Sequence, residues 1–112
     1  PLALGCVAFV VLAATVDAGV VTDGSLGSAA ALPGPRYAIP AGLGRIAGPN
    51  LFHSFSTFSL AASESAQFSG PASILNVISR VTGPGASVID GRIGCDIAGA
   101  NLFLSNPQGV VF

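Results

Sequence analysis

The 112-residue sequence contains no lysine, methionine or tryptophan, and charged residues make up only 8% of it. Soluble domains usually carry about a quarter of charged residues. The cations are four widely separated arginines: Arg36, Arg45, Arg80 and Arg92. Because proteins hold nucleic acids by their phosphates through clustered basic residues, this distribution excludes a nucleic-acid partner.

Residues that carry catalysis or bind metal ions are equally scarce. His53 is the only histidine, whereas a metal site needs several His, Cys or carboxylate ligands together. A catalytic triad needs a nucleophile, a base and an orienting acid, so we interpret His53, which stands among Phe and Ser, as a packing or surface group. Calcium would need clustered oxygen ligands, and Asp23-Gly24 and Asp90-Gly91 are typical turn dipeptides. We expect no enzyme activity, cofactor or metal.

The first segment, Pro1–Val16, is continuously apolar or small and ends at Asp17. Val16 and Ala18 place small residues three and one before Gly19, as signal peptidase requires. The sequence therefore predicts a signal peptide over residues 1–18, cleaved after Ala18 and incomplete at its start because the basic region is missing. Without an initiating Met, and ending inside an apolar run, the sequence is expected to be a piece of a longer protein.

Two alternatives to a cleaved signal remain for this segment. A transmembrane helix needs about 20 apolar residues, and this run is shorter and is followed by Gly and Ser. A lipid-modified Cys6 is disfavoured because Val7–Leu12 stays hydrophobic. After cleavage Cys95 is the sole cysteine, so we interpret it as a small buried hydrophobic residue, with pairing to a segment outside the sequence as the minor alternative.

The stretch Gly19–Gly48 is rich in Gly, Ala and Pro, with the short apolar runs Val20-Val21 and Tyr37-Ala38-Ile39 between turn residues. This pattern predicts brief strands joined by corners, with a capping layer as one interpretation. A helix is not expected, because Ala29–Leu32 is too short to hold one alone.

From Leu51 onward apolar residues become denser, and Ile74–Val81 matches both a helical stripe and a strand. Periodicity cannot decide between the two over so few residues. The β-branched content and the following Thr82-Gly83-Pro84-Gly85 favour a strand with Leu75, Val77 and Val81 on one side.

Ala100–Phe112 predicts a strand, a tight corner and a second strand. Pro107 presets φ near the value of the second turn position, and Gly109 accepts φ > 0. Asn106 can bond back to nearby backbone. We expect Gly109→Val to destabilise the corner more than Asn106→Ala, unless the Asn106 amide caps buried backbone.

A weak internal repeat links these segments. Val77 and Leu102 are 25 positions apart, and Val88 and Val110 are 22 apart. Strand, corner and strand recurring at about 20–25 residues indicates a β-solenoid of stacked coils. Asn76 and Asn101, also 25 apart, would then stack as an amide pair, although two unrelated exposed asparagines are the favoured interpretation.

Six short motifs in this order, behind an export signal, resemble the N-terminal secretion domain of two-partner-secreted exoproteins, the filamentous haemagglutinin family. The motifs are Asp23-Gly24-Ser25-Leu26-Gly27, Gly48-Pro49-Asn50-Leu51-Phe52-His53-Ser54-Phe55 with Phe58, Ala66-Gln67-Phe68, Ile78-Ser79-Arg80-Val81-Thr82-Gly83, Ser87-Val88-Ile89-Asp90-Gly91, and Ala100-Asn101-Leu102-Phe103-Leu104 with Asn106-Pro107-Gln108-Gly109. Gln108 and Val110 replace residues of the family's asparagine-proline-asparagine-glycine-isoleucine motif. The family's asparagine-proline-asparagine-leucine motif is absent, and Ser69-Gly70-Pro71 stands near its place.

The resemblance implies an all-β fold, a right-handed parallel β-helix, of which residues 19–112 would be the N-terminal part with its cap, truncated at the C-terminal side. It also implies recognition by an outer-membrane pore partner and export of an adhesin-like passenger to the cell surface or beyond. The motif residues that the resemblance singles out are Asn50, Phe52, Arg80, Asp90, Gly91, Asn101, Leu102, Asn106, Pro107 and Gly109.

Two other functions stay open on the sequence. One is the start of a secreted β-helical enzyme acting on polysaccharides, whose cleft would need acidic and basic clusters that this piece lacks. The other is a structural surface-layer protein that uses a different export route.

Overall fold

The computed structural model describes residues 19–112, and this part of the chain is all β apart from one short 3-10 turn, η1 (Ala41–Leu43). The predicted signal peptide, residues 1–18, lies outside the described residues. The strands are β1 (Gly19–Thr22), β2 (Ala30–Ala31), β3 (Arg36–Ile39), β4 (Arg45–Ala47), β5 (Asn50–Ser59), β6 (Ser65–Phe68), β7 (Asn76–Val81), β8 (Ser87–Val88), β9 (Arg92–Cys95), β10 (Asn101–Ser105) and β11 (Val110–Val111).

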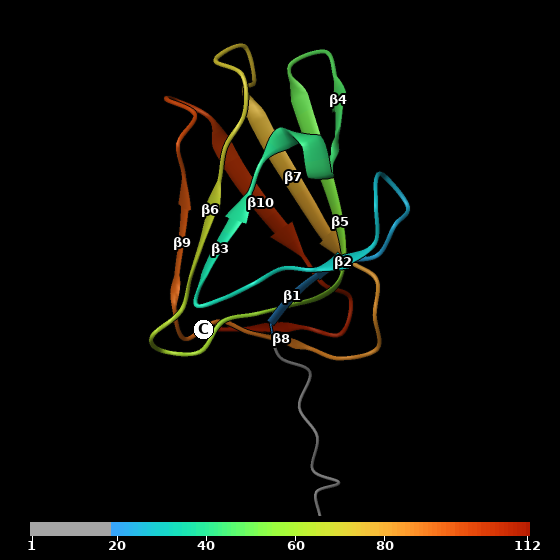
Figure 1. The fold of residues 1–112 in the computed structure, drawn as a ribbon, viewed down its shortest axis with the longest axis vertical. Coiled ribbons are helices and arrows are strands. Elements are labelled where there is room, and N and C mark those ends of the chain that lie inside the picture. The colour runs from blue at the N-terminus through green and yellow to red at the C-terminus, as the bar shows by residue number, and fades with distance from the viewer. Residues whose placement is uncertain (1–18) are drawn as a thin grey trace, which may run out of the picture.

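Strands distant in sequence pair in parallel and form three ladders. One ladder is β5-β7-β10, the second is β3-β6-β9 and the third is β8-β11 (Figure 1). Leu102 pairs with Val77, which confirms the predicted spacing of 25 residues. The second predicted spacing is wrong by one residue, because Val88 pairs with Val111 while Val110 pairs with Ser87.

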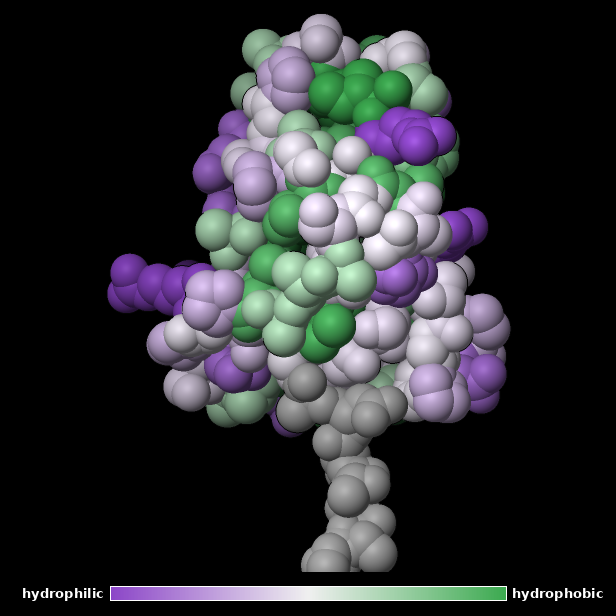
Figure 2. All heavy atoms as spheres, turned by 45° about the vertical axis from the view of Figure 1, so that its right-hand side comes forward, coloured by the Kyte–Doolittle hydropathy of each residue, from purple (hydrophilic) through white to green (hydrophobic). Residues whose placement is uncertain are grey.

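The sheets are mixed, because the first strands pair in the antiparallel sense. β4 covers the first half of the outer edge of β5, with Ala47 opposite Asn50, and β1 covers the second half, with Gly19 opposite Ser59. β2 extends this sheet beyond β1. The brief strands predicted for Gly19–Gly48 are confirmed, and the antiparallel cover removes unpaired backbone groups that would otherwise form an exposed edge. Figure 2 shows that the side with β4 has a mostly weakly polar and apolar surface.

The segment Ile74–Val81 forms a strand, as predicted, but the strand begins at Asn76. Leu75 lies before it and is 56% exposed, so its expected place beside Val77 and Val81 is wrong. The inward face of β7 carries Val77, Ser79 and Val81, which are all buried. The inward positions follow the two-residue period of a strand.

The core lies between the ladders, and its side chains stack in register from strand to strand. Leu51, Val77 and Leu102 form one such column. Phe55, Phe58 and Phe68 pack edge-on or stacked, with ring centroids between 5.0 and 6.4 Å apart. Burying a large apolar side chain stabilises the fold by roughly 1.5–3 kcal/mol, so these columns supply much of the drive for folding. No helix within residues 19–112 is long and apolar enough to cross a membrane.

Candidate functional site

The corner Asn106-Pro107-Gln108-Gly109 is closed by the hydrogen bond from the Gly109 N–H to the Asn106 carbonyl, 2.9 Å long. Gly109 has φ +110°, as its predicted turn position requires, and Pro107 is exposed. The Asn106 side chain is buried at 9% exposure. Its Oδ1 accepts the Gln108 N–H at 2.9 Å, so side chain and backbone together shape the turn.

The same Asn106 side chain joins this corner to the one before it. Its Nδ2 donates to the Gly85 carbonyl and to the Ser87 Oγ, each at 3.0 Å. Asn106 therefore caps a partly buried backbone carbonyl and also bonds a buried hydroxyl, so we expect its loss to cost at least as much as that of Gly109. These bonds hold the corner over Gly85 and Ser87 and fix Val110 opposite Ser87, which explains the one-residue error in the predicted spacing.

Three asparagines on successive strands form an amide ladder, defined here as Asn50, Asn76 and Asn101. Asn76 Nδ2 donates to Asn50 Oδ1 at 3.0 Å, and Asn101 Nδ2 donates to Asn76 Oδ1 at 3.2 Å. The favoured interpretation of Asn76 and Asn101 as unrelated residues is therefore wrong. The third member was missed, although its separation of 26 residues from Asn76 nearly repeats the spacing of 25.

Replacing Asn76 with alanine is expected to lower the free energy of unfolding by about 1 kcal/mol. Both amide bonds of the ladder pass through this residue, but the ladder is partly solvated, and a typical hydrogen bond contributes about 0.5–1.5 kcal/mol net. Urea denaturation followed by circular dichroism measures the change. Asn101→Ala, which removes only one bond, is the matched control and should cost less; equal stability of the parent and both variants would contradict a stabilising ladder.

Arg80 and Asp23 belong to one hydroxyl network. Arg80 is exposed, and its Nε donates to Ser54 Oγ at 2.9 Å while its second terminal nitrogen donates to Ser25 Oγ at 3.2 Å. Asp23 accepts bonds from Ser54 Oγ at 2.6 Å, Thr82 Oγ1 at 2.7 Å, and the Ser25 N–H and Oγ at 2.9 and 2.7 Å. The network ties the loop after β1 to β5 and to the end of β7.

The Asp23 carboxyl was interpreted from the sequence only as a turn residue, so its role in this network was missed. Burial acts to raise its pKa, but the hydrogen bonds from Ser54, Ser25 and Thr82 outweigh burial and hold the pKa well below the usual value. Asp23 therefore stays ionised at pH values where a fully solvated aspartate would be protonated. The sequence hint of this network was that Ser and Thr recur in the motifs, but only the fold shows that Ser25, Ser54 and Thr82 meet at one carboxylate.

The remaining motif residues lie at separate places. Asp90 is exposed, and its N–H donates to the Leu60 carbonyl at 2.8 Å. Gly91 packs so closely that an added Cβ would meet the carbonyl oxygen of Glu64. Phe52 is half-buried on β5, and Leu102 is half-buried on β10. Thus the structure does not gather all ten motif residues into one site.

His53 lies in the core at 1% exposure, with its ring 5.8 Å from that of Phe55 and 5.4 Å from that of Phe68. Within residues 19–112 neither ring nitrogen has a hydrogen-bond partner, and the same holds for the Oγ of Ser79, its neighbour in register on β7. Burial lowers the pKa of His53 to about 4. His53 is therefore a neutral packing residue, one of the two roles expected for it.

Acidification is expected to destabilise the protein as the pH falls from about 6.5 to about 4. His53 has a pKa of about 4 when folded and an ordinary value of 6.5, so its contribution is complete above 6.5 and is lost as the unfolded state takes up the proton first. The loss approaches about 3 kcal/mol at about 1.4 kcal/mol per pKa unit. Urea midpoints measured across this pH range test it, and His53→Leu should flatten the dependence; a wild-type protein equally stable at pH 4.5 and 7 would contradict it.

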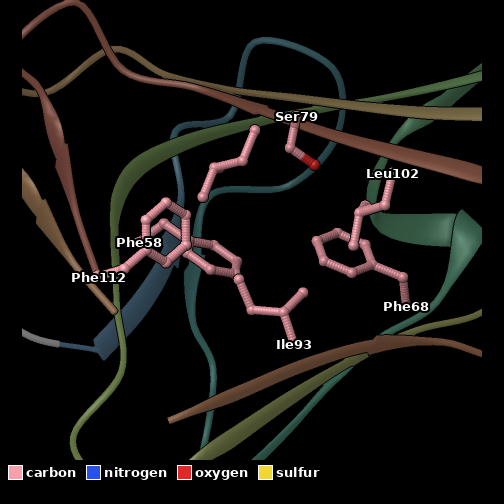
Figure 3. Close-up of a pocket in the computed structure, with 7 residues that line it drawn as sticks. Phe58, Phe68, Ser79, Ile93, Leu102 and Phe112 are labelled. Carbon is pink, nitrogen blue, oxygen red and sulfur yellow. The ribbon is translucent and has the colours of Figure 1, made fainter. Parts of the chain in front are cut away.

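An apolar cavity of about 230 Å³ opens between β9 and β10. Figure 3 shows the Ser79 hydroxyl pointing into the space between Phe58, Phe68, Ile93 and Leu102. No titratable side chain lines this cavity. Residues 19–112 also hold no group of three or more His, Cys, Asp or Glu that could bind a metal ion. Cys95 is a free thiol packed partly buried against the core.

These contacts fix corners and strands; they do not place a nucleophile beside a base. In comparison with known proteins, the family model of the TPS secretion domain matches residues 18–112. No curated protein and no solved structure gives a significant match.

Proposed function

We propose, because this chain belongs to the TPS secretion domain family, that an outer-membrane pore partner recognises it and thereby exports an adhesin- or haemagglutinin-like passenger. The family's role is secretion targeting in two-partner secretion, which is a transport role and not a catalytic one. The chain is thus part of an exoprotein exported across the outer membrane. The observation that carries the proposal is the family match over residues 18–112, which includes every described residue.

The fold that we propose for the longer secretion domain is a right-handed parallel β-helix, with residues 19–112 at its N-terminal side. Its support is the set of three parallel ladders, whose steps run from 23 residues (Ser87 to Val110) to 29 residues (Arg36 to Ser65). β1 and β4, antiparallel on the outer edge of β5, would serve as the cap. Residues 1–18 would be the signal peptide that delivers the chain to the inner-membrane export machinery.

Export from intact cells tests the function. The complete exoprotein would be produced with and without an outer-membrane pore protein of the two-partner secretion type from the same genome. Its amount in the medium and on the surface would be compared with that in the periplasm. We expect export only when the pore protein is present and residues 19–112 are intact. Equal export without the pore protein, or after deletion of residues 19–112, would refute the proposal.

A further inference from the structure

An apolar row runs across the outward face of the ladder β5-β7-β10. It consists of Phe52, Ile78 and Phe103, which are partners in register on the three strands. Leu51 and His53, the neighbours of Phe52 in sequence, are buried in the core, so Phe52 points to the other face. Phe103 is 53% exposed, and Phe52 and Ile78 are half-buried. We call these three residues the outer apolar row.

Polar residues border the outer apolar row on both sides, two positions away along each strand. On one side stands the amide ladder, and on the other stand Ser54, Arg80 and Ser105, again in register. The outward face of a sheet that meets water normally carries polar side chains, and the bordering positions follow this rule. Only the middle row breaks it, on all three strands, and apolar patches rimmed by polar residues mark interaction sites.

The row also borders a hollow of about 120 Å³, lined by Leu26, Phe52, His53, Ile78 and Arg80. Leu26 comes from the loop that Asp23 and Ser25 hold in place through Ser54 and Arg80. The hollow is therefore built from a fixed loop and two strands, and it does not depend on a freely moving side chain.

Two guanidinium groups stand beside the row. Arg80 lines the hollow, and its hydrogen bonds go to the hydroxyls of Ser54 and Ser25, not to a carboxylate. Arg45, the partner of Phe52 in register on β4, is exposed. The Asp23 carboxylate, which accepts bonds from the same two hydroxyls, offsets part of the charge of Arg80. Two guanidinium groups against one carboxylate still leave the surface positive, and such a surface is complementary to apolar side chains flanked by carboxylates.

We propose that the outer apolar row is the docking surface for the periplasmic part of the pore partner, through an apolar strip of that partner edged by Asp or Glu. The inference rests on the proposed function and adds the site of contact to it. A second copy of this chain fits less well, because two-fold pairing brings the same surface, with its guanidinium groups, against itself. A membrane surface fits less well too, because residues 19–112 contain no lysine and carry four acidic residues against four arginines.

Titration calorimetry tests the site by measuring how the purified exoprotein chain binds the purified periplasmic portion of the pore protein used in the export assay. Phe103→Ser is expected to weaken binding about tenfold or more, as truncation of a buried aromatic anchor does. Leu75→Ser is the matched control, because Leu75 is similarly exposed at 56% but lies outside the row; it should change the affinity less than about twofold, as is usual for residues outside a hot spot.

Ser105→Glu is a second variant that leaves the apolar residues in place. Ser105 is exposed and lies opposite Arg80 in register, so a carboxylate there would occupy the guanidinium group and repel the carboxylates of the partner. Binding should weaken with a folded protein, which circular dichroism verifies. This variant tests the site even if Phe103→Ser lowers stability.

Each outcome decides a different statement. If the wild-type chain binds and both row variants bind equally well, the docking site is wrong while the proposed function stands. If the wild-type chain does not bind, both recognition by the pore partner and this site are refuted. If light scattering shows a wild-type dimer that Phe103→Ser abolishes, the row is a contact between copies and the proposal is overturned.

Discussion

Asn106→Ala is expected to lower the free energy of unfolding by about 2–4 kcal/mol, the largest effect of any motif residue in the corner. The change leaves the Gln108 N–H, the Gly85 carbonyl and the Ser87 hydroxyl without the partners that they have in the native protein. Of the three bonds, the one to the Ser87 hydroxyl is buried and the other two are partly buried. A buried polar group left unpaired costs about 1–3 kcal/mol, and the two partly buried groups cost less because water can reach them. Urea denaturation midpoints of the parent and the variant measure the loss.

Gly109→Val serves as the comparison for Asn106→Ala. Gly109 has φ +110°, but no atom lies within 4 Å of an added Cβ, so only backbone strain opposes the change, at about 1–3 kcal/mol. The asparagine variant should therefore be at least as unstable as the glycine variant. A Gly109→Val protein clearly less stable than Asn106→Ala would contradict this order. An Asn106→Ala protein as stable as the parent would show that the amide bonds contribute little, and the bridge between corners would have to be discarded.

Gly91→Ala is expected to cost about 3 kcal/mol or more, because the space for a methyl group is filled by backbone. An added Cβ would meet the carbonyl oxygen of Glu64 and would lie 2.7 Å from that of Ala61. Neither carbonyl can move freely: the Glu64 carbonyl accepts the Arg92 N–H, and the Ala61 carbonyl accepts the Glu64 N–H. Overpacking a filled site usually costs about 1–3 kcal/mol and occasionally more.

Gly42→Ala is the matched control for Gly91→Ala, since nothing lies within 4 Å of a Cβ at Gly42. Its thermal midpoint should stay close to that of the parent, whereas Gly91→Ala should melt several degrees lower or fail to fold. A Gly91→Ala protein with an unchanged midpoint would mean that the corners after β5 and β8 do not pack closely. The export assay gives an independent check, because a misfolded corner should reduce the amount exported.

Local chemistry predicted the turn at Asn106 and the strand character of Ile74–Val81, whereas the family was predicted from the resemblance of six motifs and is confirmed by the family model. The local predictions succeeded because Pro107 and Gly109 restrict the backbone directly, and because β-branched residues favour strands. The 25-residue step from Val77 to Leu102 was also within reach, since both residues are apolar and point inward.

The errors and omissions concern contacts between distant segments. The partner of Val88 on β11 was predicted as Val110 but is Val111. A hydrophobic pattern cannot distinguish two adjacent valines, and the register depends instead on the contacts of Asn106. Gly91 was interpreted as a turn glycine, whereas the structure requires it for close approach to Glu64. Asp23 bonds to Ser54, which is 31 positions away in the sequence, and to Thr82, which is 59 positions away. A short motif cannot specify which of these distant hydroxyls contact the carboxylate.

The amide ladder fixes the register in which β7 and β10 pair. Sliding β10 by one residue on β7 would turn the Asn101 amide toward the core and Phe103 with it, since neighbouring residues in a strand face opposite ways. Loops between rungs can differ in length, as the steps of 26 and 25 residues already do. Insertions or deletions should therefore be tolerated in the connecting loops. Inserting or deleting one residue within β7 or β10 would instead exchange the side chains that face the core with those that face solvent.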